Sequence, residues 1–138
     1  MAQIAFQLVL PEQSLASEQA DMVVVPGGEG DFGVLPGHVP MISTVRPGVI
    51  EVHVGGKVKD RYMVAGGFAE VTGERCTVLA EEAMPFAQVT AAALQERISR
   101  AQQSLSAATN DNERAEAEKS LAVAQDLQRA HAYYSTRA

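Results

Sequence analysis

The sequence predicts an antiparallel β-sandwich, or flattened barrel, over residues 1–84, followed by an α-helical hairpin over residues 85–138. The first observation behind this prediction is that all 11 glycines and all 6 prolines lie at or before Pro85. The second is that the net charge of −6 resides in the first part, whereas basic and acidic residues balance in the second. Glycine and proline disfavour helices and alanine favours them, so two architectures meet near Pro85.

Short apolar runs that end at turn residues predict the strands of the first part. In chain order they are Ile4–Leu10, Met22–Val25, Val49–Val54, Arg61–Ala65, Phe68–Thr72 and Cys76–Ala80. Gly55-Gly56, directly after the third run, is a two-residue hairpin signal. Many short strands at this spacing, with no helical stretch between them, are typical of an antiparallel sandwich or flattened barrel.

Two amphipathic repeats after Pro85 predict the two helices. Apolar residues recur every three or four positions, as Leu94, Ile98, Ala101, Leu105 and Ala108 in the first helix and as Ala117, Leu121, Ala124, Leu127 and Tyr134 in the second. Thr90 is the expected N-cap of the first helix, and the turn at 109–112 supplies caps for the second. A turn this short makes the hairpin antiparallel. Its alanine-rich stripes bury little area, so we expect a detachable hairpin.

Length, charge and cysteine content exclude several classes of protein. A chain of 138 residues corresponds to one domain, or to one domain with an appendage. The single cysteine, Cys76, excludes an internal disulfide and a cysteine-based zinc site. A net charge of −6 argues against a nucleic-acid partner, because binding phosphates requires a basic face. The sequence also predicts no membrane-spanning segment and no secretory signal, and therefore a soluble intracellular protein.

The segment Gly28–Gly33 matches the dinucleotide-binding pattern G-x-G-x-x-G. That pattern requires a helix next, with its N-terminus facing the pyrophosphate, and Pro36 and Pro40 forbid a helix there. Glu29 and Asp31 would also place negative charge where phosphate should bind. The glycines are better interpreted as residues that supply positive φ angles in tight turns.

No constellation of residues with catalytic or metal-binding spacing is found. His38 lies in a proline- and glycine-rich loop, His53 in a strand and His131 in the last helix, so they form no metal signature. Cys76 lies within an apolar strand and is interpreted as a core residue. The sequence therefore predicts neither an enzyme nor a resident metal or cofactor.

The run Pro26–Pro40, with its GEG-x-x-G-x-LPGH pattern, closely resembles the signature loop of the ε subunit of F-type ATP synthases. The resemblance continues through Arg46–Ile50, Val64–Val71 and Thr77–Ala83, and so extends almost without gaps to residue 84. The helical tail matches in length and pattern rather than in residues. The boundary near Pro85 is also where this family passes from sandwich to helical hairpin.

This resemblance implies a non-catalytic rotor subunit of a proton-driven ATP synthase. In the family the sandwich grips the γ subunit and rests on the membrane c-ring, so that rotation of the ring becomes rotation of γ during ATP synthesis. The implied location is peripheral, on the cytoplasmic face of the bacterial inner membrane. A contact of the hairpin with the catalytic β subunits, and regulation of ATP hydrolysis by it, are left open.

The interface residues implied by the resemblance are Glu29, Asp31, Phe32, Leu35, Pro36, Gly37 and His38. Proline and glycine fix the shape of this loop, which reduces the ordering entropy lost on docking. The carboxylates are available to pair with basic loops. The structural alternative is that these residues only close the end of the sandwich.

One departure from the family concerns nucleotide. Several bacterial members carry Ile/Leu-Asp-x-x-Arg-Ala at the start of the first helix, a pattern associated with ATP binding. Here Thr90 replaces the acid and Ala93 the arginine, and only Arg100 fits a further arginine position. We therefore expect no useful ATP binding. Two other functions are compatible with the sequence: a stand-alone module that binds a small ligand and, with less support, a hydrolase. Co-purification with γ from membranes would distinguish a rotor subunit from both.

Overall fold

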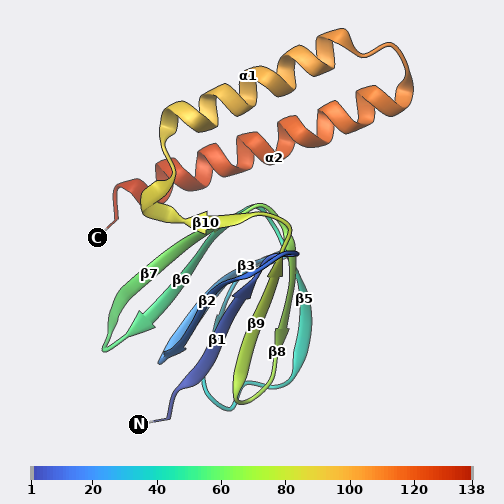
Figure 1. Cartoon of the computed structure of the whole chain (residues 1–138). Coiled ribbons are helices and arrows are strands. Elements are labelled where there is room, and N and C mark those ends of the chain that lie inside the picture. The colour runs from blue at the N-terminus through green and yellow to red at the C-terminus, as the bar shows by residue number, and fades with distance from the viewer. Residues whose placement is uncertain (1, 138) are drawn as a thin grey trace.

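The computed structural model describes residues 2–137 and has a β-sandwich with a helical hairpin lying across one end (Figure 1). This arrangement confirms the predicted sandwich followed by a helical hairpin. The strands are β1 Ile4–Val9, β2 Ser14–Ala20, β3 Met22–Gly27, β4 Gly30–Val34, β5 Met41–Val45, β6 Gly48–Val54, β7 Lys57–Val64, β8 Gly67–Val71, β9 Arg75–Ala80 and β10 Ala83–Pro85.

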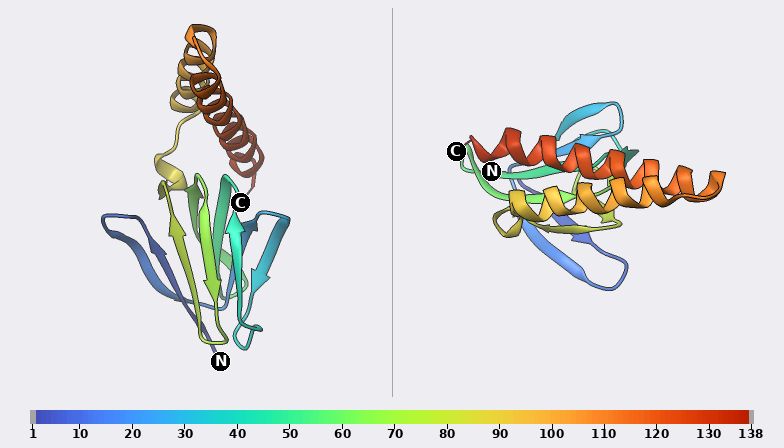
Figure 2. Two further views of the ribbon diagram at one scale, coloured as in Figure 1. Left: turned by 90° about the vertical axis from the view of Figure 1, so that its right-hand side faces the viewer. Right: turned by 90° about the horizontal axis from the view of Figure 1, so that it is seen from above.

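The strands form one sheet that folds over on itself. Its order is β10-β7-β6-β3-β5-β8-β9-β1-β2, with β4 paired to β3. All pairs are antiparallel except β1 and β9, which run parallel, with Phe6 opposite Cys76. These two strands are far apart in sequence, so no hairpin turn dictates their relative direction. Figure 2 shows that the β1–β2 and β3–β4 hairpins project on opposite sides of the sandwich.

Alternating side chains of the strands fill the space between the layers. In β1 the inward residues Ile4, Phe6 and Leu8 are completely buried. The rest of this core is mostly β-branched: Val23, Val25, Val34, Val45, Ile50, Val52, Val64, Val71 and Val78, with Ala20, Ala69, Cys76 and Ala80. This core lies within the sandwich and contains no residue of either helix.

Four strands of the sheet were not predicted from the sequence: β2, β4, β5 and the short edge strand β10. β2 contains no β-branched residue and β4 contains two glycines, so their local strand propensity is weak. Pairing with β1, β3 and β8 holds them extended instead. The glycine interpretation is also corrected, because in the G-x-G-x-x-G run only Gly30 has a positive φ, +140°. Gly28 is required by close approach, since a Cβ there would lie 2.2 Å from Thr44 Oγ1.

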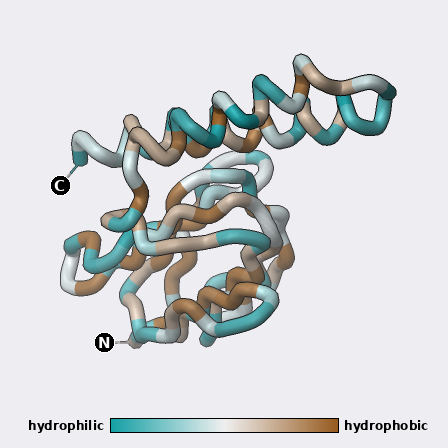
Figure 3. The backbone as a smooth tube through the Cα atoms, turned by 45° about the horizontal axis from the view of Figure 1, so that its top comes forward, coloured by the Kyte–Doolittle hydropathy of each residue, from teal (hydrophilic) through white to brown (hydrophobic). Residues whose placement is uncertain are grey.

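Both predicted helices are present and capped by polar side chains. After the short 3₁₀ helix η1 (Phe86–Gln88), α1 spans Ala91–Ala107 and α2 spans Asp111–Ser135. Thr90 Oγ1 accepts a hydrogen bond from Ala93 N at 3.1 Å, as the N-cap prediction requires. Asn110 caps α2 by accepting from Glu113 N at 2.9 Å. Figure 3 shows hydrophilic residues at the turn between the two helices.

The hairpin touches the sandwich through a second, smaller core. Val49, Met63 and Ala65 of the sandwich pack against Val89, Leu94 and Leu127, and the half-buried Phe86, Val123, Ala130 and Tyr134 surround them. Pro85, where the sequence places the domain boundary, is the last residue of β10 and pairs with Tyr62 of β7. The far end of the hairpin extends beyond the sandwich (Figures 1 and 2).

Candidate functional site

The structure divides the predicted interface loop between the two ends of the sandwich. Gly27 pairs with Gly30, so Glu29 lies at the tip of the β3–β4 hairpin. The next residues form β4, which runs the length of β3 until Val34 pairs with Val23. Leu35–His38 therefore lies at the opposite end from Glu29 and Asp31. A segment that is continuous in sequence thus contributes two separate surfaces.

The first surface is acidic and lies beside the helical hairpin. Asp31 forms an ion pair with Arg46, and Arg46 also donates to Gly27 O at 2.6 Å. Both side chains of the pair are about half exposed, at 46% and 42%. They line a cleft of 540 Å³ together with Tyr133 and Tyr134 of α2. Glu29, at the tip, is exposed to solvent.

The second surface is a turn held by backbone contacts. Gly37 has a φ of +85°, and its N–H donates to Gly73 O at 2.8 Å, which fixes the turn against the β8–β9 connection. His38 Nδ1 lies 2.7 Å from Val39 O and the imidazole is half-buried, so it is less exposed than the sequence predicts. Leu35 is 53% exposed.

Phe32 differs from the other predicted interface residues in where its side chain lies. It is opposite the buried Val25 in the β3–β4 pair and packs against the sandwich core. Its ring also lies where a Cβ on Gly27 would be, at 2.8 Å. Such a Cβ would also lie 2.7 Å from Gly30 O, so this backbone oxygen and the Phe32 ring together explain the glycine at position 27.

An exposed apolar strip crosses the outer face of β5, β8 and β9, and sequence reasoning missed it. We define the strip as Ile42, Phe68 and Leu79, which are 73%, 56% and 50% exposed. Phe68 lies directly opposite Leu79, and Ile42 is its diagonal neighbour on β5. The signal was available in β8, where Ala69 and Val71 point inward, so that Phe68 must point outward.

The strip continues into a hollow at one end and into the Leu35–His38 turn at the other. The hollow has a volume of 400 Å³ and is lined by residues of both neighbouring strands and the β1–β2 connection: Val9, Leu10, Pro11, Gly67, Phe68, Leu79, Ala80 and Glu81. At the other end Val39, 75% exposed, precedes β5. Glu70 and Thr44 share this face as the direct partners of Ile42 and Phe68. A group of large exposed apolar side chains on one face typically marks an interaction site.

Side chains alone close the seam between β2 and β7. Glu18 lies 3.0 Å from Lys59 Nζ and accepts a hydrogen bond from Tyr62 Oη at 3.2 Å. Burial raises the pKa of Asp60, and its hydrogen bond with Glu18 raises it further. Burial, reinforced by the charge of Glu18, raises the pKa of Tyr62 to about 12. This cluster joins the two layers of the sandwich and has no partner outside them among residues 2–137.

Arg100 lines a cleft between α1 and β10 that has a volume of 330 Å³. Arg97, in the same cleft, makes a two-pronged ion pair with Glu82 at 3.0 and 2.9 Å. The Thr90 hydroxyl is used by the N-cap, and Ala93 contributes only a methyl group. The cleft therefore presents one guanidinium already paired with a carboxylate and one on exposed Arg100.

The three histidines and the cysteine lie in different parts of the fold. His53 Nε2 lies 3.4 Å from Glu51 Oε1, and His131 Nε2 lies 3.2 Å from Val89 O with its ring stacked on Phe86. Burial raises the pKa of Cys76 to about 12, which makes it a core residue with an unreactive thiol. Within residues 2–137 no group of three or more His, Cys, Asp or Glu could hold a metal ion.

The helices in the described part of the chain are too short in apolar sequence to cross a membrane. Both α1 and α2 are amphipathic and carry charged residues along their exposed faces.

Comparisons with known proteins agree with this architecture. The family model of the ATP synthase delta/epsilon chain β-sandwich domain matches residues 3–86. The chain is 53% identical to the ATP synthase epsilon chain of Rhodospirillum rubrum over 122 residues, covering 88% of this chain and 91% of that one. It is 52% identical to the epsilon chain of Paramagnetospirillum magneticum over 124 residues, covering 90% and 93%.

Two solved structures are similar over nearly the whole chain. A chain of the Euglena gracilis mitochondrial ATP synthase, in a structure of OSCP, F1 and the c-ring, superposes with a TM-score of 0.78 at 27% identity, covering 94% of this chain and 82% of that one. A chain from the central stalk and c-ring of the Tetrahymena thermophila mitochondrial ATP synthase superposes with a TM-score of 0.63, covering 93% and 96%. At 13% identity the latter likeness concerns the fold alone.

Proposed function

Because this chain belongs to the delta/epsilon-chain family of ATP synthases, we propose that it acts as a non-catalytic subunit of the central stalk. The observation that carries this proposal is the match of the whole sandwich to the family, together with about half-identical ε chains over most of the length. The subunit joins γ to the c-ring, so that rotation of the ring becomes rotation of γ during ATP synthesis. It contributes shape and binding energy rather than chemistry.

The apolar strip is the surface best suited to γ. Ile42, Phe68 and Leu79 lie on a sheet whose backbone is held on both sides by neighbouring strands. Docking on this face therefore requires little reordering, and burying the half-exposed side chains provides the affinity. The hollow beside Leu10 and Pro11 offers space for a partner side chain at the edge of the strip.

The acidic surface is better suited to the polar loops of the c-ring. The β3–β4 hairpin projects from the sandwich (Figure 2). Glu29 is exposed at its tip, and Asp31 follows in β4. Arg46 holds Asp31 through an ion pair and is itself fixed to Gly27 O, so the carboxylate has a defined position. Basic loop residues are attracted by this arrangement and orient the subunit on the ring. The Leu35–His38 turn contacts the rotor at the other end of the strip.

The proposed location follows from these partners. The protein is peripheral, on the cytoplasmic face of a bacterial inner membrane, and is membrane-associated through the complex. A contact of the hairpin with the catalytic β subunits is part of the same proposal, because the far end of the hairpin is exposed and extends beyond the sandwich (Figure 1).

Co-purification tests this function directly. Affinity-tagged chain, expressed at its natural level, should be recovered from detergent-solubilised membranes together with γ and the c-ring. A Phe68→Asp variant, which places a charge in the strip, should remain folded and lose both partners. Recovery of the wild-type chain free of γ in the cytosolic fraction would contradict the proposal and favour a stand-alone ligand-binding module.

A further inference from the structure

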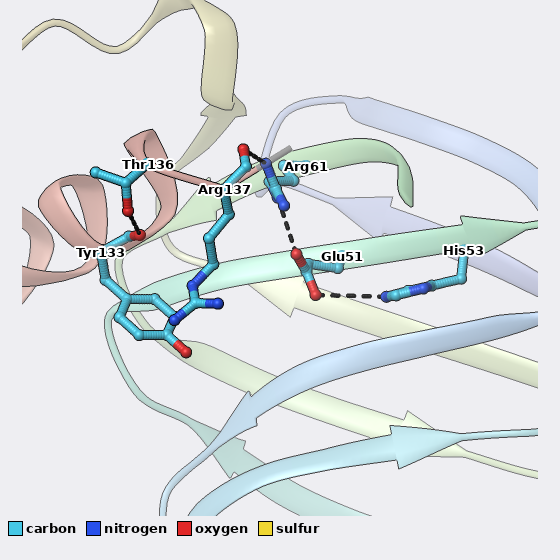
Figure 4. A network of polar contacts seen from close by, with 6 residues as sticks. All are labelled: Glu51, His53, Arg61, Tyr133, Thr136 and Arg137. Carbon is cyan, nitrogen blue, oxygen red and sulfur yellow. Dashed lines mark hydrogen bonds and ion pairs between the residues drawn. The ribbon is translucent and has the colours of Figure 1, made fainter. Parts of the chain in front are cut away.

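The end of α2 meets the sandwich at Arg61, in the middle of β7. Arg61 lies opposite Glu51 of β6, and its Nε donates to Glu51 Oε2 at 2.8 Å on the outer face of the sheet (Figure 4). Both side chains are only 13% exposed. The other oxygen of Glu51 faces His53 at 3.4 Å. An ion pair this shielded from water is stronger than one on the open surface.

Arg61 also contacts the last turn of α2. Its Nη1 donates to Arg137 O at 3.2 Å, and its guanidinium carbon lies 5.5 Å from the centre of the Tyr134 ring. The last turn of α2 contains no basic residue of its own. The carbonyl end of a helix carries partial negative charge that a cation stabilises. Arg61 therefore adds a cation from the sandwich at the end of α2, where it bonds to the carbonyl of the residue after the C-cap.

Hydrogen bonds and ring contacts hold the residues around this contact in place. Thr136 Oγ1 donates to Tyr133 O at 3.1 Å, and Arg137 N donates to Tyr134 O at 3.2 Å. The Arg137 guanidinium lies 3.8 Å from the centre of the Tyr133 ring, and the two tyrosines meet edge to face at 4.9 Å. The segment Tyr133–Arg137 is thus held together by its own contacts. Arg61 contacts it at two points, Arg137 O and the Tyr134 ring.

We propose that Arg61 is a positioning residue that clasps the C-terminal turn of α2, Tyr133–Arg137, onto the sandwich and so sets how firmly the helical hairpin is held. The Arg97–Glu82 ion pair between the hairpin and the sandwich lies next to the linker, at the start of α1. The apolar contact is small, with Leu127 at its centre. The Arg61 contacts add the polar attachment that does not involve the linker.

The length of the hairpin makes the attachment at its base decisive. α2 has 25 residues, about 37 Å at 1.5 Å per residue, and its residues in the second core all lie in its C-terminal half. The other half packs on α1, where the buried residues Ile98, Ala101 and Ala117 belong to neither core of the sandwich. Because the hairpin contacts the sandwich only near one end, losing a contact there allows the whole hairpin to change its orientation. Loss of the clasp therefore frees the hairpin without unfolding either helix.

Hydrogen–deuterium exchange of the full chain tests the clasp. In Arg61→Met, amides in the last two turns of α2 should exchange about ten- to a hundredfold faster, the factor expected for losing a charged hydrogen bond. Arg61→Met combined with Glu51→Gln should behave alike, without leaving Glu51 half-buried and unpaired. Arg75→Met removes an exposed arginine from β9, on the other layer, and should leave the exchange of α2 unchanged.

Three results would overturn the proposal. The first is unchanged exchange of α2 in both Arg61 variants. The second is faster exchange of β6 and β7 by the same factor as α2, which would make Arg61 a stabiliser of the sandwich alone. The third concerns a chain shortened by removing residues 133–138: there Arg61→Met should add nothing to the exchange of residues 120–130, and a further tenfold rise would refute the clasp. The experiments use the isolated subunit, so they do not depend on its place in the rotor.

Discussion

Replacing Phe68 and Leu79 by serine should strongly weaken binding to γ while leaving the sandwich folded. The two side chains face each other across β8 and β9, and they are 56% and 50% exposed in the isolated chain. Their inner neighbours Ala69 and Val78 fill the core and are untouched by the change. The double variant therefore removes apolar surface from the outer face without opening a cavity in the core.

The magnitude follows from the exposed areas. Side chains of this size present roughly 150–200 Å² when free, so each leaves about 80–110 Å² to be buried by a partner. At about 25 cal/mol per Å² this is about 2–3 kcal/mol for each residue, and about 4–5 kcal/mol for the pair. The entropy cost of docking is common to variant and wild type, so the affinity should fall about a thousandfold or more.

Isothermal titration of purified γ into the chain measures this change. Met84→Ser is the matched control, because Met84 is 41% exposed on β10, away from the strip. The control should bind as the wild type does, and the free energy of unfolding of the double variant should fall by only about 1 kcal/mol. Wild-type affinity in the double variant, or an equal loss in Met84→Ser, would refute the assignment of the strip to γ.

Charge reversal by Glu29→Lys with Asp31→Lys should weaken assembly with the c-ring more than it lowers the melting temperature. The reason is that the exposed ion pair it removes, Asp31–Arg46, contributes only about 0–1 kcal/mol to stability. A large fall in the melting temperature together with the loss of assembly would make these residues structural. A chain of residues 1–88, which keeps β10 and η1, should unfold cooperatively as a β-rich domain, because no residue of α1 or α2 enters the sandwich core. Circular dichroism and gel filtration measure this, and an aggregated or unfolded fragment would contradict it. MgATP should not bind more tightly than the millimolar range in calorimetry, and tighter binding abolished by Arg100→Ala would show that other residues complete the site. Asp60→Asn should stabilise the chain at pH 7. Because the pKa of Asp60 is raised in the folded state, this carboxyl ionises at lower pH in the unfolded state, so the stability of the wild type falls as the pH rises above about 4. Equal urea midpoints of the two proteins at pH 7 would exclude this effect.

The sequence predicted those strands whose own residues favour extended structure. β6 and β9 are rich in β-branched residues and end at clear turns, and both were placed within a residue or two. β2 contains no β-branched residue, and its pairing with β1 supplies the missing preference. β5 (MISTV) was missed although Ile42, Thr44 and Val45 favour extended structure. The helices were predicted because the apolar stripe and the Thr90 cap are local features.

The candidate site was predicted less completely than the fold. The resemblance pointed to the segment from Glu29 to His38, yet its residues lie on two ends of the sandwich because β4 intervenes. The apolar strip was missed because Ile42, Phe68 and Leu79 come from three different strands, and only the pairing of β5 with β8 and of β8 with β9 brings them onto one face. No local pattern distinguishes an outward apolar residue that docks a partner from one that is exposed singly.

The sequence by itself determined the properties that depend on residues close together along the chain. Turn residues, alternation and helical periodicity specify two architectures and the boundary near Pro85. Only the tertiary structure decided the parallel pairing of β1 with β9, the seam at Glu18 and the contact of Arg61 with the end of α2. The physical reason is that these contacts join residues 44 to 76 positions apart in the chain, whose meeting is set by the closure of the whole sheet rather than by local preference.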